Sequence, residues 1–240
     1  MGSTRLPGKV LKPICGKPML ALQIERIQQS ILIDEIIIAT SNSANDNSIE
    51  SFAQSIGIPC FRGSENDVLS RIVGTLQAYN AEIHVEFMGD NPIPDSQLVD
   101  SIIGFYLKNA GKYDYVTNAL KTTYPPGAEV YVYPAEILYN AEKYVNSTKL
   151  REHVGIHIYQ HPERYKIYNI EAPPWYYMPD LHLEVDTIKD FELMSRIYEV
   201  FYPTNHGFNL LQVIDYMKLH PEVAKINQGV KRRWKSFRQD

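Results

Sequence analysis

The chain has 240 residues, of which 44% are hydrophobic and 22% charged, and its formal net charge at pH 7 is −4. A chain of this length can bury a substantial core within one domain, and its negative charge argues against a general nucleic-acid binder. Because the sequence shows neither an apolar run of about 18 residues nor a signal-peptide layout, we expect a single domain over residues 1–240, cytoplasmic and without membrane association.

The first element is the loop MGSTRLPGK, which combines small residues with a proline and two cations. Small residues let backbone N–H groups approach phosphate oxygens, and Arg5 and Lys9 add positive charge. The loop is not a P-loop, because five residues separate Gly2 from Gly8 and Val10 follows the lysine. From spacing alone, the loop is either a phosphate cradle or a plain surface turn.

After this loop, segments with helical periodicity alternate with short apolar runs. Helices are predicted over residues 18–29, 48–57, 64–80 and 95–111, and strands over 34–40, 58–61, 82–88, 114–119 and 129–133. This alternation is typical of right-handed βαβ units. We therefore predict an α/β fold with a mostly parallel, Rossmann-like sheet covered by helices.

Two aspartates follow predicted strands at the sheet edge where ligands of α/β proteins bind. Asp90 follows the run EIHVEFM, and Asp186 follows LHLEV. Either residue alone could be a helix N-cap, but the pair also suits Mg²⁺, with phosphate oxygens and water as the other ligands. Together with the basic loop, the pair favours metal-assisted phosphoryl chemistry. Asp190 is interpreted as an acid that stabilises the start of a helix.

Residues 121–177 contain three Tyr-rich stretches and the turn YPPG. Proline and glycine suit a turn and tyrosine suits a strand, so this region predicts a β-containing extension laid across the site. Glu129, in YPPGAEVYVY, is then either an ordinary hairpin residue or an acceptor for a substrate hydroxyl.

The segment REHVGIHIYQH places His153, His157 and His161 at i, i+4 spacing, which predicts that all three share one helical face. A zinc site is disfavoured, because the HExxH order is lacking. Arg151 and Glu152, with His153, are interpreted as a polar cluster aimed at a substrate. A surface helix is the alternative.

The chain closes with KRRWKSFRQD, a segment rich in cations. We interpret it as a solvated basic tail, with binding to an anionic partner as the alternative; its cations are Lys231, Arg232, Arg233, Lys235 and Arg238. Cys15 and Cys60 form neither a CxxC pair nor a metal-binding spacing. They are expected to be free thiols in a reducing compartment.

Taken together and in chain order, seven motifs resemble the cytidylyltransferase family of spore coat polysaccharide biosynthesis protein F. They are GSTRLPGKVLKPICGKPML, IATSN, FRGSENDVLSR, GDNP, YPPGAEV, REHV and EVDTIKDFEL, and the closing HPEVAKINQGVK also matches. That family is similar to the bacterial enzymes that activate 3-deoxy-manno-octulosonate and acylneuraminate with CTP. The resemblance implies one nucleotidyltransferase domain with the fold of the nucleotide-diphospho-sugar transferases.

The resemblance also implies roles for individual residues. The nucleotide would be bound by Gly2, Ser3, Arg5, Lys9, Asn42 and Arg62. The catalytic set would be Arg5, Lys9, Asp90 and Asp186, with Mg²⁺ (or Mn²⁺) held by the two aspartates. The sugar side would consist of Glu129, Arg151, Glu152 and His153.

The sequence departs from the family pattern at several positions. Asn42 and Tyr131 stand where the family often has acids, and His182 stands where it has an arginine. The family also has a strand ending in Ala-Arg directly before the phosphate loop, whereas this sequence opens within the loop. We therefore expect the first strand to be missing, through a late-called start codon or a partial gene.

The implied reaction is transfer of CMP from CTP to an acidic sugar, with release of pyrophosphate, in surface polysaccharide or glycan biosynthesis. CTP and the acidic sugar are the expected partners, and a homodimer is possible because relatives are usually dimers. Two alternatives remain open at this point. One is a nucleotidyltransferase that uses another nucleotide and a sugar phosphate, and the other is a non-catalytic homologue that binds nucleotide or sugar.

Overall fold

A computed structural model of the protein describes residues 1–232, and the predicted tail residues Arg233, Lys235 and Arg238 lie outside this range. The described strands are β1 (Pro13–Ile14), β2 (Lys17–Pro18), β3 (Ile38–Ser41), β4 (Cys60–Gly63), β5 (Ile83–Glu86), β6 (Tyr115–Thr117), β7 (Tyr131–Pro134) and β8 (Ile167–Asn169). The described α-helices are α1 (Met19–Ile27), α2 (Asn47–Ser55), α3 (Val68–Ala78), α4 (Ser96–Lys108), α5 (Ala135–Tyr144), α6 (Thr148–Glu152), α7 (Ile156–Tyr159), α8 (Ile188–Phe201), α9 (Leu210–Leu219) and α10 (Pro221–Ala224).

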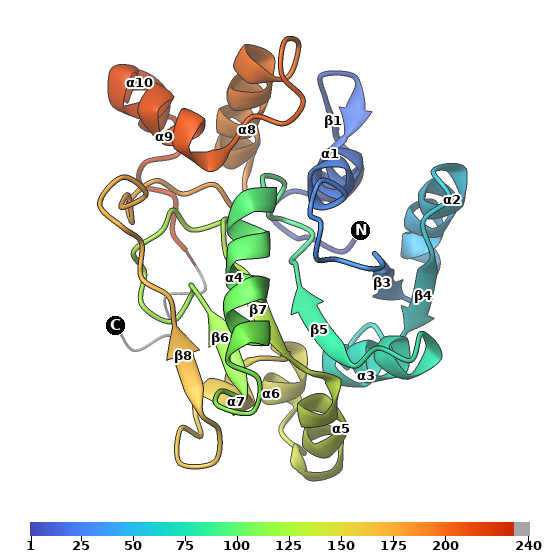
Figure 1. Cartoon of the computed structure of the whole chain (residues 1–240). Coiled ribbons are helices and arrows are strands. Elements are labelled where there is room, and N and C mark those ends of the chain that lie inside the picture. Colours follow the sequence, from blue (N-terminus) through green and yellow to red (C-terminus); the bar gives the residue numbers. More distant parts are fainter. Residues whose placement is uncertain (233–240) are drawn as a thin grey trace.

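The main sheet has the strand order β5-β7-β6-β8. β7 is antiparallel to both β5 and β6, while β8 is parallel to β6, so β5, β6 and β8 run in one direction. β3 and β4 form a separate parallel pair, which Figure 1 shows to the right of the main sheet, together with α2. The predicted α/β fold class with mostly parallel strands is confirmed.

Helices cover the main sheet and close one end of it. Figure 1 shows α4 in front of β6 and β7, and α8, α9 and α10 grouped at the top. The largest hydrophobic cluster lies among α4, β6, β7, α8 and α9, and it includes the fully buried Ile102, Val132, Ile197 and Val213. Burial of these apolar side chains is the main favourable contribution to folding of this part.

The side chain of Asp95 helps to explain where α4 and α9 begin. The Asp95 carboxylate accepts hydrogen bonds from the backbone N–H groups of Gln97 and Leu98 at the start of α4. The other Asp95 oxygen accepts from the backbone N–H of Leu210, 2.6 Å away, at the start of α9. One buried carboxylate therefore satisfies donors at the N-termini of two helices.

The prediction for residues 121–177 needs one correction. The region contains strands, but β7 is inserted between β5 and β6 and β8 lies at the sheet edge, so both belong to the main sheet. Cross-strand packing explains this position, because Val132 of β7 is fully buried in the core opposite Val116 of β6. The turn 125–128, not the strands, is the part that lies beside the candidate site.

The predicted histidine face is wrong. His153 ends α6 in an extended conformation (φ −123°, ψ 91°), and a second short helix, α7, begins only at Ile156. His157 belongs to α7 and His161 follows it, so the three imidazoles do not share a helix. Within residues 1–232 no cluster of three or more His, Cys, Asp or Glu side chains could hold a metal ion.

Three further expectations from the sequence concern a membrane-spanning segment, the two cysteines and the basic tail. None of the helices within residues 1–232 combines the length and apolar character that crossing a membrane requires. Cys15 and Cys60 are free thiols, as predicted. Arg232 is not part of a solvated tail, because its side chain is only 2% exposed in a buried ion pair.

Candidate active site

The basic loop ends in a sharp turn that directs Lys9 into the molecule. Gly8 has a φ of 67°, in the left-handed region that favours glycine, and the 3-10 turn η1 (Lys9–Leu11) follows it. Ser3 supports the loop by accepting a hydrogen bond from the backbone N–H of Leu6 with its Oγ. The Lys9 side chain is 11% exposed, so its ammonium needs acceptors inside the protein.

Lys9 brings the two predicted aspartates together. Its Nζ lies 3.0 Å from Asp90 Oδ2 and 3.2 Å from Asp186 Oδ1, and it donates to the Val185 carbonyl at 2.7 Å. The loops that carry the aspartates are also joined directly, because the Val185 N–H donates to the Asp90 carbonyl at 2.8 Å. Residues about a hundred positions apart therefore converge on one cation.

Arg5 completes this charged cluster. One of its Nη atoms lies 2.6 Å from Asp186 Oδ2, and the other donates to the Lys231 carbonyl at 3.4 Å. The cluster of Arg5, Lys9, Asp90 and Asp186 thus contains two cations and two carboxylates, all partly accessible to solvent. These are the four residues that the sequence predicts as the catalytic set.

The residues of the cluster fit a divalent metal bound together with phosphates. Asp90 and Asp186 point one oxygen each at the same ammonium, so the two carboxylates are already arranged around a single positive charge. Mg²⁺ prefers such oxygen ligands and commonly takes only one or two carboxylates, with substrate phosphates and water as the rest. Arg5 and Lys9 would be free to contact those phosphates once a metal neutralised the aspartates.

Glu129 lies next to this cluster. Its Oε2 accepts from the side chain of Asn91 at 3.2 Å and from the backbone N–H of Gly127 at 2.7 Å. Asn91 follows Asp90 directly in the sequence, so Glu129 is held one residue from a predicted metal ligand. Asn91 is not among the residues predicted from the sequence, although its place in the motif GDNP could have indicated a role beside Asp90.

The turn before Glu129 requires a glycine. Gly127 has a φ of 104°, and a Cβ at this position would lie 2.5 Å from the backbone N of Glu184 and the backbone C of Leu183. Pro126 accepts from the Leu183 N–H at 2.6 Å across the same contact. The turn thus packs against the segment that leads to Asp186.

The remaining predicted nucleotide residues lie around β3 and β4. Arg62 donates to the carbonyls of Ser41 and Ser43 and pairs with Glu50 at 2.6 Å, while the exposed Asn42 donates its N–H to Gly63. Gly2 lies near the loop that follows β4, since a Cβ at Gly2 would be 3.7 Å from a carboxylate oxygen of Glu65. None of the contacts described for Arg62 involves the charged cluster.

The predicted sugar-side residues of α6 have structural contacts. Arg151 pairs with Asp67 at 2.7 Å and with both oxygens of Glu142 at 2.9 Å, so it joins α6 to α3 and α5. The hydrogen bond to Asp67, outweighing desolvation, raises the pKa of Arg151 above its ordinary value. Glu152 is exposed and His153 is half-buried. The described contacts of Arg151 do not include the charged cluster.

Asp190 has more partners than sequence analysis predicted. It forms a capping box with Thr187 at the start of α8, as expected of a first-turn acid, and it also pairs with Arg232 at 2.8 Å. Burial alone would raise the pKa of Asp190, but hydrogen bonds from Arg232, Thr187 and Asn227 outweigh it and lower the pKa. No local sequence pattern indicates the contacts with Asn227 and Arg232.

The chain matches known proteins over nearly its whole length. A family model described as cytidylyltransferase matches residues 1–225. An uncharacterized protein of Methanocaldococcus jannaschii is 34% identical over 99% of this chain and 94% of its own length. The spore coat polysaccharide biosynthesis protein SpsF of Bacillus subtilis is 33% identical over 83% of each chain.

Two further similarities bear on the fold and the reaction class. The 3-deoxy-manno-octulosonate cytidylyltransferase of Thermodesulfovibrio yellowstonii is 28% identical over 66% of this chain and 71% of its own. The solved structure of a cytidylyltransferase from Leptospira borgpetersenii superposes with a TM-score of 0.90 at 27% identity, covering 97% of this chain and 95% of that one.

Proposed function

Because the chain belongs to the cytidylyltransferase family, and so to the nucleotidyltransferases, we propose that it transfers CMP from CTP to an acidic sugar and releases pyrophosphate. The observation that carries this proposal is the convergence of Arg5 and Lys9 on Asp90 and Asp186. Two cations and two carboxylates in contact supply what a triphosphate with a divalent metal needs: positive charge for phosphate oxygens and hard oxygen ligands for the metal.

In the proposed reaction, the residues of the cluster change partners when nucleotide binds. Arg5 and Lys9 leave the carboxylates and contact phosphate oxygens, where they stabilise the negative charge that builds up during in-line attack and on the departing pyrophosphate. Asp90 and Asp186 would hold Mg²⁺ (or Mn²⁺), which would supply positive charge to offset that of the phosphates and to lower the pKa of the acceptor hydroxyl. The hydrogen bond from the Val185 N–H to the Asp90 carbonyl holds the loops that carry the two aspartates at a fixed distance from each other.

The acceptor belongs on the side of the cluster where Glu129 lies. A carboxylate held by Asn91 and Gly127 can accept a hydrogen bond from a sugar hydroxyl beside the metal. An acidic sugar is supported by the similarity to a 3-deoxy-manno-octulosonate cytidylyltransferase, and polysaccharide biosynthesis by the similarity to SpsF. We retain Arg151, Glu152 and His153 as proposed sugar-side residues only through their resemblance to the family motif.

A pyrophosphate-release assay tests this proposal. CTP, UTP, GTP and ATP are each paired with 3-deoxy-manno-octulosonate, N-acetylneuraminate or glucose 1-phosphate, in Mg²⁺ or Mn²⁺ and again in EDTA. We expect metal-dependent release with CTP and an acidic sugar. Release with another nucleotide and glucose 1-phosphate would favour the alternative acceptor class, and no release from any pair would contradict the proposal.

A further inference from the structure

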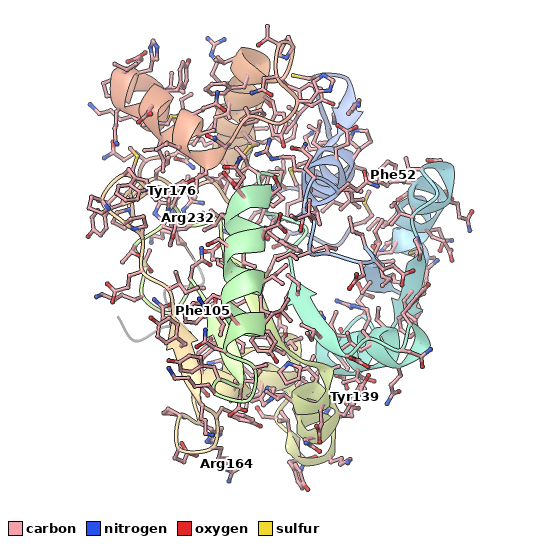
Figure 2. All side chains as sticks on the ribbon, viewed as in Figure 1. Phe52, Phe105, Tyr139, Arg164, Tyr176 and Arg232 are labelled. Carbon is pink, nitrogen blue, oxygen red and sulfur yellow. The ribbon has the colours of Figure 1, made fainter. Side chains whose placement is uncertain are left out.

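The C-terminal segment 227–232 enters the interior of the protein. The Arg232 side chain is 2% exposed and lies between the helices at the top of the molecule and the strands below them (Figure 2). Its Nη2 lies 2.8 Å from Asp190 Oδ1, and its Nε lies 3.4 Å from Glu184 Oε1. Both carboxylates are at least nine-tenths buried.

Asp190 connects this segment to Asp186. Its Oδ1 accepts from Arg232 and from the Asn227 amide, both at 2.8 Å. Its Oδ2 accepts from the backbone N–H groups of Asp186 and Thr187 at 3.1 and 2.8 Å, and from the Thr187 hydroxyl. One carboxylate therefore holds the C-terminal segment with one oxygen and the Asp186 loop with the other.

The same segment touches the site at two other places. The Asn227 amide also donates to the His182 carbonyl at 2.9 Å, on the stretch that leads to Asp186. The Lys231 carbonyl accepts from Arg5, which pairs with Asp186. An open pocket of about 460 Å³ lies beside these contacts, and it is lined in part by Arg5, Thr187 and Lys231.

A buried ion pair is a weak source of stability, because the cost of removing the charges from water offsets most of their attraction. It is, however, highly directional, since charge-assisted hydrogen bonds from a guanidinium hold a carboxylate in a narrow range of orientations. Because Asp190 accepts a hydrogen bond from the backbone N–H of Asp186, fixing the orientation of Asp190 also fixes the backbone of Asp186. The orientation of the Asp186 carboxylate in turn affects how well it can bind a metal.

We propose that Arg232 and Asn227 are positioning residues, which orient Asp186 through the buried carboxylate of Asp190. The C-terminal segment is then part of the catalytic site although it contains none of the metal ligands. The inference that this orientation serves catalysis rests on the role of Asp186 in the proposed function.

The test compares Arg232→Met, Arg232→Lys and Asn227→Ala with two controls. Met217→Ala removes a buried core side chain of α9 that takes part in none of these hydrogen bonds, and Arg196→Met removes an exposed arginine of α8. Hydrogen–deuterium exchange at the amides of Asp186 and Thr187 is measured at temperatures where all variants have equal free energies of unfolding. The affinity for Mn²⁺ is measured by electron paramagnetic resonance with CTP present. The values of kcat and KM are determined separately in the pyrophosphate-release assay.

We expect faster exchange at the two amides and a rise of about tenfold or more in the Mn²⁺ Kd for Arg232→Met and Asn227→Ala, but not for the controls. Arg232→Lys should recover part of both effects, because it keeps the charge. Exchange and Mn²⁺ affinity equal to those of wild type in Arg232→Met would overturn the proposal. If exchange is faster in Arg232→Met but the wild type releases no pyrophosphate, the link between Arg232 and Asp186 is supported. In that case only the proposed function is contradicted.

Discussion

At the scale of single residues, Lys9 has the largest role in assembling the site. Its ammonium contacts both aspartates and the Val185 carbonyl, although the three acceptors lie far from it in the sequence. Its positive charge lies between the two carboxylates. The charge balance of the cluster therefore changes strongly if any of its members is neutralised.

Replacing Asp186 with asparagine tests this balance. Asp186→Asn keeps the shape of the side chain but removes the negative charge that a metal requires, so metal-dependent pyrophosphate release should fall by about 10²- to 10³-fold. Asp180→Asn, an exposed change six residues earlier, should keep wild-type activity. Circular dichroism checks that both variants are folded. Unchanged release in Asp186→Asn would remove this residue from the metal site.

His84 makes the stability of the protein depend on pH. Burial lowers the pKa of His84 to about 4, whereas in the unfolded chain it is near 6.5. Between these values only the unfolded chain binds the proton, so stability falls as the pH drops from 6.5 to about 4 and this contribution then levels off. The loss amounts to about 3 kcal/mol for this residue.

Urea unfolding between pH 7 and pH 4.5 measures this effect. His84→Phe should reduce the pH dependence, because phenylalanine keeps the contact with Tyr133 and does not titrate. Equal pH dependence in wild type and His84→Phe would show that His84 is not the cause of this dependence.

At the scale of elements, the turn 125–128 shows how a loop places a functional residue. It is held against residues 183–184 by close backbone contact, and it presents Glu129 beside Asn91. The contact depends on the lack of a side chain at Gly127. Proline and glycine in YPPG predict the turn, but its partner lies almost sixty residues later.

Gly127→Ala should therefore be strongly destabilising. The new Cβ would meet backbone atoms at 2.5 Å and would also force alanine into a left-handed φ, so we expect a loss of more than about 2 kcal/mol in the free energy of unfolding. Gly111→Ala is the matched control, because Gly111 has a φ of 79° and open space around it. It should lose only about 1 kcal/mol. Equal losses in chemical denaturation would rule out the close contact.

The short helices α6 and α7 show where element prediction failed. Regular spacing of three histidines suggested one helix, but the chain turns between His153 and Ile156. A tertiary contact overrides the local pattern, because Gly155 passes so close to Tyr115 that a Cβ would lie 3.0 Å from its hydroxyl oxygen. Arg151 is likewise used for packing α6 against α3 and α5.

At the scale of the whole molecule, the site is assembled from three segments that lie far apart in the chain. Lys9 comes from the first loop, Asp90 from the loop after β5, and Asp186 from the start of α8. Nucleotide that binds across these three segments binds the folded protein in preference to the unfolded chain. It should then stabilise the fold as a whole.

CTP with Mg²⁺ should accordingly raise the Tm. At about 100 times its Kd, a ligand adds about 2.7 kcal/mol, which corresponds to roughly 5–10 °C for a chain of this size. EDTA should remove most of the shift, and Asp186→Asn should not show it. Differential scanning fluorimetry gives the measurement. A shift that is the same with and without metal would contradict a site in which the two aspartates bind Mg²⁺ with the nucleotide.

Much of the fold follows from local sequence. Local periodicity predicted the strands β3 to β7 and the helices α1 to α4 within a few residues, because the spacing of buried positions depends on neighbours in the chain. The caps at Asp95 and Thr187 are local for the same reason. Asp90 could be selected because residues that follow a strand face the ligand edge of an α/β sheet. For Asp186 the premise was wrong, because residues 181–185 are not among the described strands and Asp186 directly precedes the capped start of α8.

What the sequence by itself determined is therefore the helices α1 to α4, the strands β3 to β7, and the chemical types of the residues in the loops that carry the site. Only the tertiary structure decided which of those residues meet: Lys9 with both aspartates, Glu129 with Asn91, and Arg232 with Asp190. These pairs lie between 38 and 177 positions apart, so they depend on how the packed elements are placed in space. Arg232, in a basic stretch typical of a solvated tail, could be assigned to the interior only from that packing.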